Sequence, residues 1–151
     1  MKCCHEKRIV NSEKAPKAIG PYSVGVQAGG LVFTAGQIGL VPATGNIVEG
    51  GVEAETRQAL LNLKSILEDA GTGFDRVVKT TVFLRDMKDF ASMNAIYGEF
   101  FMENPPARSA VQVAALPKGA AVEIEAIALM PCDCDCDEDC GEGECNCGCG
   151  K

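Results

Sequence analysis

The chain has 151 residues, 46% of them hydrophobic, which fits one globular domain with a buried core, and no stretch is apolar enough to cross a bilayer. Most of the net charge of −7 lies in the C-terminal tail. Residues 132–151 hold seven acidic side chains and one basic side chain, Lys151, and so carry −6, which leaves −1 for the other 131 residues. A nearly neutral body, and an opening MKCCHEKRIV without an apolar signal region, argue against nucleic-acid and membrane partners and favour the cytoplasm.

The hydrophobic pattern of the body predicts five strands and two helices. A glycine turn at 28–30 suits a tight hairpin, Gly71 ends the first helix, and Asn104-Pro105-Pro106 ends the second. The predicted order is β-β-α-β-α-β-β, an α+β fold with a single sheet and both helices on one of its faces. In chain order the elements are strands 24–27 and 31–35, helix 52–70, strand 77–84, helix 89–101, and strands 109–115 and 122–129.

The last predicted strand has two different faces. One set of alternate positions is wholly apolar, and we expect it to lie beneath the helices. The other set consists of Glu123, Glu125, Ile127 and Leu129 and is too apolar to face water alone. Self-association through this face of the sheet is the simplest way to cover it.

Few residue types are available for chemistry in the body. His5 is the only histidine, and no cysteine occurs between residues 5 and 131, which excludes Ser-His-Asp and Cys-His catalysis, His-rich metal sites and a disulfide framework there. Arg108 nevertheless stands at the mouth of an apolar strand and Glu123 within one, where charges are costly unless they are paired or useful. An arginine can bind a carboxylate with two hydrogen bonds, and a glutamate can activate water. This pair suggests a small enzyme that acts on a carboxylate-bearing metabolite.

The distance between these two residues depends on how the last two strands are arranged. If they pair as a hairpin, Arg108 and Glu123 are about six residues apart along the strands, or roughly 20 Å. They could not then bind one small molecule within one subunit. Either the two strands are not neighbours, or the two side chains meet across a subunit boundary.

Six segments, taken in order, resemble the RidA/YjgF family of small trimeric proteins that hydrolyse reactive imines or enamines. They are AIGPYS (18–23), FTAGQI (33–38), VKTTVFL (78–84), FASMN (90–94), PARS (106–109) and VEIEAIA (122–128). The resemblance covers about residues 8–130, so we expect a RidA-like domain at 1–130 and a separate tail at 131–151. It implies a chorismate-mutase-like homotrimer, with sheets packed around a central barrel and active sites in clefts between protomers.

The resemblance also implies roles for single residues. Arg108 would bind the substrate carboxylate, or else form a structural ion pair, and Glu123 would orient the hydrolytic water. Glu125 would be structural. Tyr22 would take a direct part in catalysis, through shaping the substrate site more than through proton transfer, or else pack half-buried. Asn94 would contact substrate or hold a loop.

Two positions depart from the family pattern. Members often carry serine at the position of Ala35 and cysteine at that of Ala110. Any substrate contact at these positions must therefore use backbone groups, with Gly36 allowing close approach. A covalent thiol mechanism in the body is excluded.

The implied reaction is hydrolysis of 2-imino acids, such as 2-iminobutanoate and 2-iminopropanoate, to 2-oxo acids and ammonia. Pyridoxal-phosphate (PLP) enzymes release such imines, so the activity would protect PLP enzymes. A protonated imine is already electrophilic, and no cofactor is expected for catalysis. The alternatives are a non-catalytic trimeric sensor of 2-oxo acids and an RNA-directed translation inhibitor or ribonuclease. The near-neutral body and the lack of a catalytic histidine argue against the RNA-directed role.

The acidic tail is rich in cysteine and lies outside the resemblance. It has no apolar residues beyond cysteine, so we expect it to be disordered without a metal. Clustered thiolates select soft or borderline ions such as Zn(II) and Cu(I), and a redox-reactive or merely solvating tail is the alternative. The candidate ligands are Cys132, Cys134, Cys136, Cys140, Cys145, Cys147 and Cys149.

Overall fold

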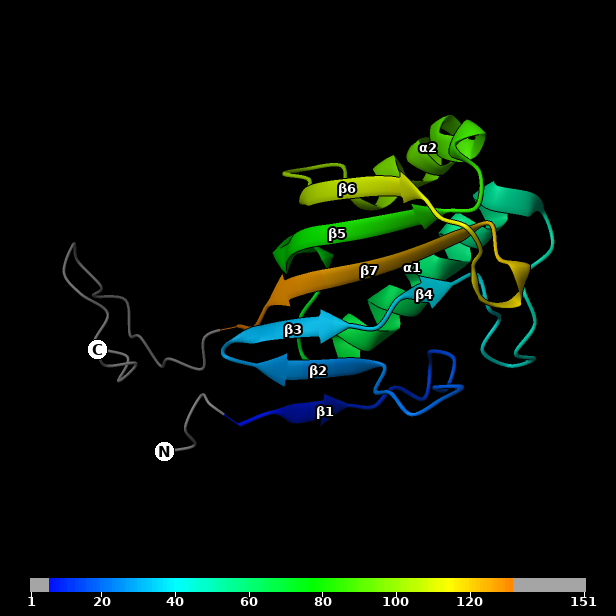
Figure 1. The fold of residues 1–151 in the computed structure, drawn as a ribbon. Helices are drawn as coiled ribbons and strands as arrows, with labels where there is room; N and C mark the ends of the chain where they lie inside the picture. The colour runs from blue at the N-terminus through cyan, green and yellow to red at the C-terminus, as the bar shows by residue number, and fades with distance from the viewer. Residues whose placement is uncertain (1–5, 132–151) are drawn as a thin grey trace.

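The computed structural model describes residues 6–131, which form one mixed sheet and two helices (Figure 1). Both helices contribute to a single apolar core against the same face of the sheet. The helices are α1 (Gly51–Asp69) and α2 (Phe90–Phe100). The strands are β1 (Arg8–Val10), β2 (Gly25–Ala28), β3 (Leu31–Thr34), β4 (Gln37–Ile38), β5 (Val77–Leu84), β6 (Ala107–Gln112) and β7 (Val122–Leu129).

The strands follow the order β1-β2-β3-β7-β5-β6, with β4 pairing beside β3 on the same edge of β7. All pairs are antiparallel except β5 with β6. The predicted α+β class with a single sheet is therefore confirmed. The two additional strands, β1 and β4, have only three and two residues.

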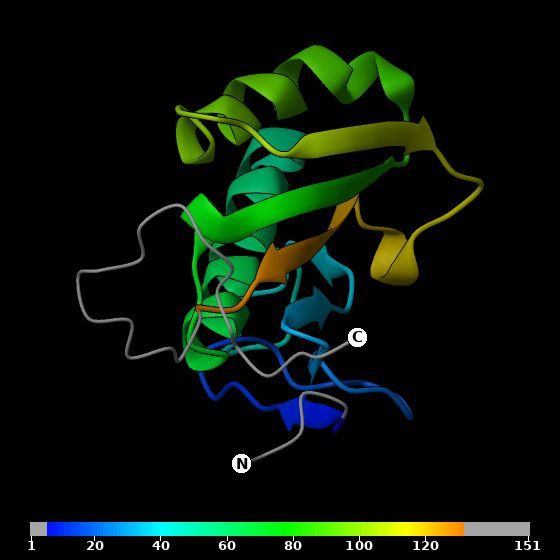
Figure 2. The same ribbon diagram turned by 90° about the vertical axis from the view of Figure 1, so that its left-hand side faces the viewer.

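The last two strands of the chain are not neighbours, because β5 lies between β6 and β7. Helix α2 connects β5 to β6, and such a helical crossover is the usual way to bring two strands parallel. The chain then returns through a short 3-10 turn, Pro117–Gly119, and β7 pairs on the other side of β5. Figure 2 shows α2 beyond the β6 edge of the sheet and α1 behind the central strands.

The two faces of β7 differ as predicted. Its apolar set is completely buried in the helix-side core, together with the inner stripe of α1. On the opposite face, large apolar side chains remain exposed, including Phe33 (41%), Val111 (43%) and Leu129 (46%). The Gly29-Gly30 turn joins β2 to β3, and both glycines have positive φ, as the tight hairpin requires. Among residues 6–131, neither helix is long and apolar enough to cross a membrane.

Candidate active site

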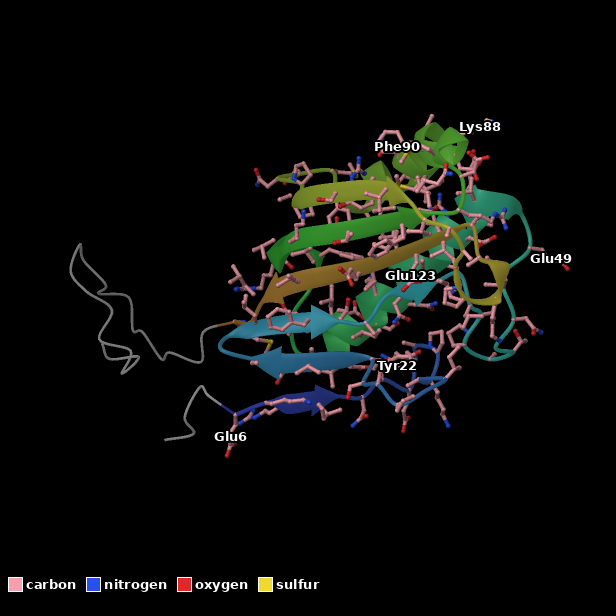
Figure 3. All side chains as sticks on the ribbon, viewed as in Figure 1. Glu6, Tyr22, Glu49, Lys88, Phe90 and Glu123 are labelled. Atoms are coloured by element: carbon pink, nitrogen blue, oxygen red, sulfur yellow. The ribbon has the colours of Figure 1, made fainter. Side chains whose placement is uncertain are left out.

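A pocket of about 280 Å³ lies where β4 runs beside β7. Its lining brings together four of the predicted site residues, Tyr22, Ala35, Gly36 and Glu123, which we call the Glu123 group. Tyr22 comes from the loop before β2 and Glu123 from the start of β7 (Figure 3). The rest of the wall is mainly apolar and includes Ile19, Val24, Ile38, Leu40 and Pro117.

The side chain of Glu123 lies directly over Gly36. A β-carbon placed on Gly36 would be 2.7 Å from Glu123 Cδ and 2.9 Å from its Cγ, which is closer than real contacts allow. The group that lies against Gly36 is therefore a protein carboxylate, and the predicted approach of substrate at this position stays a prediction. The lack of a side chain at position 36 gives Glu123 its place in the pocket.

The carboxylate of Glu123 is suited to act as a base. It is half-buried, and within residues 6–131 it has no ion-pair partner. Burial, together with the neighbouring charge of Glu125, raises the pKa of Glu123 above its ordinary value. A carboxylate with a raised pKa is a stronger proton acceptor once it is ionised.

The turn before β2 holds Tyr22 at the mouth of the pocket. The Ile19 N–H donates a hydrogen bond to the Tyr22 hydroxyl at 3.3 Å, and the ring is 48% exposed. The backbone of Ala35 is already engaged, because its N–H donates to Val24 O at 2.8 Å and its carbonyl accepts from Gln37 Nε2 at 3.3 Å. The proposed backbone contact of Ala35 with substrate would therefore have to displace or share an existing hydrogen bond.

Arg108 lies elsewhere, on the edge strand β6. It pairs with the fully buried Thr80 of β5, and its guanidinium carbon stands 4.6 Å from the centroid of the Tyr97 ring and 5.6 Å from that of Phe90. No ion pair within residues 6–131 involves Arg108, so the alternative of a structural ion pair finds no partner there.

Two other predicted residues belong to the neighbourhood of Arg108. Asn94 stands between Phe90 and Tyr97 on α2, at a spacing that puts all three on one side of the helix. Ala110 is two residues beyond Arg108 on the same face of β6 and packs against the helix-side core. We call Arg108, Asn94 and Ala110 the Arg108 group.

The two groups lie on opposite faces of the sheet. Arg108 pairs with Thr80, whose side chain is buried beneath the helices, whereas Glu123 pairs with Phe83 on the other face of β5. The positions are also two strands and three residues apart, or roughly 10 Å in each direction. Figure 3 shows Phe90 of α2 near the β6 edge of the sheet, Tyr22 toward the other edge near β2, and Glu123 between them. One subunit alone cannot place both groups on one small molecule.

Residues 6–131 contain no group of three or more His, Cys, Asp or Glu side chains that could hold a metal ion. The predicted ligands of the tail, Cys132 to Cys149, lie outside the described residues. The metal hypothesis for the tail thus stays a prediction.

The sequence did not identify the aromatic neighbours of Arg108. Helical spacing places Phe90 and Tyr97 on the apolar stripe of the second helix, and Tyr97 does belong to the core. Periodicity alone cannot tell a ring that packs on aliphatic side chains from one that packs on a guanidinium. One signal was available in the sequence. A tyrosine in a buried stripe indicates a polar neighbour, since its hydroxyl needs a hydrogen-bond partner.

Comparison with known proteins gives a consistent result. The profile of the endoribonuclease L-PSP family matches residues 12–130. A RutC family protein of Pyrococcus horikoshii is 53% identical over 81% of this chain and 97% of its own length. The 2-iminobutanoate/2-iminopropanoate deaminase of Mus musculus is 53% identical over 82% of this chain and 91% of its own length.

Solved structures agree with this result. The crystal structure of the YjgF gene product from E. coli has a TM-score of 0.77 and 49% identity, covering 82% of this chain and 99% of that one. The crystal structure of E. coli TdcF with bound serine has a TM-score of 0.78 and 45% identity, with the same coverage.

Proposed function

We propose that this chain, which belongs to the endoribonuclease L-PSP family predicted above as RidA/YjgF, hydrolyses 2-imino acids to 2-oxo acids and ammonia. The substrates would include 2-iminobutanoate, 2-iminopropanoate and their enamine forms. The observation that carries this proposal is the high identity, over nearly the full domain, to a deaminase of these two imines. The available side chains fit the chemistry, since both are only partly buried: a guanidinium with no ion pair within residues 6–131, and a carboxylate of raised pKa.

We infer that the active site forms between two copies of the chain, with the Arg108 group of one subunit facing the Glu123 group of the next. The separation of the two groups within one subunit supports this arrangement. The apolar sheet face that carries Phe33, Val111 and Leu129 also needs a cover, and a homotrimer would bury it. Oligomerisation would then be a condition of activity.

In this site Arg108 would hold the substrate carboxylate through two hydrogen bonds. Glu123 would accept a proton from a water molecule as its oxygen attacks the protonated imine carbon. The resulting carbinolamine collapses when its nitrogen is protonated, the C–N bond breaks, and the hydroxyl proton is lost. The products are a 2-oxo acid and an ammonium ion. Positioning and a general base are sufficient for this reaction, which as written uses no cofactor.

The first prediction concerns Arg108. Arg108→Ala should lower imine hydrolysis by about 10²-fold or more, because the substrate carboxylate loses its bidentate partner. Arg108→Lys should recover only part of the activity, because an ammonium group lacks the planar fork. The measurement is ammonia release when a threonine dehydratase supplies the imine, with gel filtration to show that the oligomer persists. Full activity of an intact Arg108→Ala oligomer would refute the assigned role.

Two other functions remain to be separated from imine hydrolysis, one by the ammonia-release assay and the other by an assay of RNA cleavage. The name of the family itself suggests RNA cleavage, and a neighbour with bound serine is consistent with ligand sensing. The near-neutral body and the lack of histidine beyond His5 favour imine hydrolysis over RNA cleavage. A sensor would bind 2-oxo acids without accelerating ammonia release, and a ribonuclease would degrade RNA in a manner independent of Arg108. We further propose a cytoplasmic location and a protective role toward PLP enzymes.

We also propose that the tail, residues 131–151, binds a soft metal ion such as Zn(II) or Cu(I). Its seven cysteines, most of them in Cys-x-Cys pairs, support this proposal. Metal analysis of anaerobically purified protein should find an ion that is absent when all seven are changed to serine. Equal metal content in the two proteins would refute it.

A further inference from the structure

Arg108 is held by aromatic rings where an acidic partner would be expected. Its guanidinium carbon is within cation–π distance of both Tyr97 and Phe90, and no ion pair within residues 6–131 involves it. A carboxylate partner would occupy the N–H donors of the guanidinium and compete with the substrate carboxylate. A cation–π contact with a ring, unlike an ion pair, does not use the N–H donors for hydrogen bonds to a carboxylate of the protein.

The Tyr97 ring is fixed in turn by the sheet. The hydroxyls of Tyr97 and Thr80 share a hydrogen bond of 2.7 Å, and both side chains are buried. The Phe101 ring packs against Tyr97 with a centroid separation of 4.6 Å. Burial raises the pKa of the Tyr97 phenol, although Thr80 and Arg108 oppose this shift. The phenol therefore stays protonated in the physiological pH range.

Thr80 connects these contacts to Arg108. It is the direct neighbour of Arg108 across the β5–β6 pair, so the strand that orients the Tyr97 hydroxyl also sets the backbone position of the arginine. The ring and the guanidinium therefore share one rigid support. A ring held only by apolar packing could tilt with α2, whereas this one is tied to the sheet.

We propose that Tyr97, anchored by Thr80, is a positioning residue that holds the Arg108 guanidinium with its donors free and so determines the affinity for the substrate carboxylate. Phe90 contributes a second, weaker contact from the same helix. This inference rests on the proposed function, and it concerns binding of the carboxylate more than the attack of water.

The test compares Tyr97→Leu with Tyr97→Phe. Tyr97→Leu should raise KM about five- to tenfold with kcat changed less than about twofold, because a cation–π contact is lost and the base is untouched. Tyr97→Phe keeps the ring and should stay within about twofold of the wild-type KM. In an Arg108→Ala background, Tyr97→Leu should have no further effect on kcat/KM. Phe100→Leu, which removes a ring of α2 that packs on Phe74, should leave the kinetics unchanged.

A second measurement needs no substrate. The NMR resonance of the Arg108 Nε–Hε group, assigned by its loss in Arg108→Lys, should carry a ring-current shift that Tyr97→Leu removes. If Tyr97→Leu does not fold, Phe90→Leu should change KM and the resonance in the same direction by less. An unchanged KM together with an unchanged resonance in the folded variant would overturn the inference. A wild-type protein that neither releases ammonia nor binds 2-oxobutanoate would refute the proposed function. The ring-current shift of the Arg108 resonance would still show whether Tyr97 positions the guanidinium.

Discussion

At the scale of single residues, the acidity of Glu123, as the proposed base, would set the pH range in which the enzyme can work. Its pKa is raised first by burial and second by Glu125. The activity that needs its ionised form should fall, as pH is lowered, at a higher pH than for an ordinary glutamate. Glu125→Gln removes the like charge and lowers the pKa of Glu123. The acidic limb of the kcat/KM profile should therefore move to lower pH.

The control for this prediction is Glu53→Gln, which makes the same charge change on the exposed first turn of α1. Its kcat/KM profile should match the wild type. An acidic limb that moves to higher pH in Glu125→Gln, or that does not move, would show that Glu123 is not the titrating base.

Gly36 provides a steric test of the same carboxylate. Gly36→Ala forces Glu123 away, because the new methyl group would overlap its Cδ and Cγ. A displacement of about 1 Å can cost about 10²-fold in rate, so we expect a loss of that order in kcat. Ammonia release and circular dichroism would separate lost chemistry from lost folding. Near-normal kcat in folded Gly36→Ala would mean that the position of Glu123 does not matter.

Gly98→Ala is the matched control for that substitution. Gly98 lies in α2, and a β-carbon there would meet no atom within 4 Å. Alanine restricts the unfolded chain and suits a helix interior, so stability should rise by about 0.5–1 kcal/mol without loss of activity. Urea denaturation measures this gain.

At the scale of elements, a two-residue strand forms one wall of the pocket and needs support from outside the sheet. Asn62 of α1 supplies it, because its Nδ2 donates to Ile38 O at 3.2 Å and to Leu40 O at 2.9 Å. Asn62 is only 1% exposed. Asn62→Leu should leave a buried carbonyl without a donor and lower the free energy of unfolding by about 1–3 kcal/mol.

Urea denaturation at an unchanged m-value would measure this loss. Ser65→Ala serves as its control, since it removes only a bond to the Leu61 carbonyl on the solvent side of the same helix. A stability change within about 0.5 kcal/mol is expected there. Equal losses in the free energy of unfolding for the two substitutions would show that the hydrogen bonds of Asn62 to Ile38 and Leu40 do not stabilise the fold.

Long elements with a clear period could be predicted from the sequence, and short or non-local features could not. The helix expected at 52–70 is Gly51–Asp69, and the strand expected at 122–129 has the same bounds in the structure. The strands β1 and β4 are too short to show any alternation. The insertion of β5 between β6 and β7 depends on a crossover through α2, which local pattern does not encode.

The candidate site divides in the same way. The resemblance supplied the residue types, and the structure supplied their grouping: Glu123 with Tyr22 and Gly36, and Arg108 against the helix that carries Asn94. The expected strand began at residue 109, but β6 begins at Ala107, so Arg108 lies within the strand, where its side chain is directed to the helix face. Register decides this direction, and a shift of one residue would reverse it.

At the scale of the whole molecule, a site shared between subunits can be tested by mixing two inactive proteins. Arg108→Ala retains Glu123, and Glu123→Gln retains Arg108. In a closed trimer each site takes one group from each of two neighbours, so some sites of a mixed trimer receive both intact groups. Co-expressing the two variants in equal amounts should restore about one quarter of the wild-type activity, because that fraction of sites combines the two by chance.

The result of mixing depends on whether the Arg108 and Glu123 groups act within one subunit or between two. If both groups acted within one subunit, every site would contain one defect, and mixing would restore nothing. Light scattering should give a mass three times the 15.9 kDa of the chain for each protein, which controls for assembly. When the double variant Arg108→Ala/Glu123→Gln is co-expressed with wild type, each double-variant subunit should inactivate the two sites to which it contributes, and activity should fall accordingly. Recovery with the two single variants would therefore locate catalysis at the boundary between subunits, where the proposed site joins the Arg108 group of one to the Glu123 group of the next.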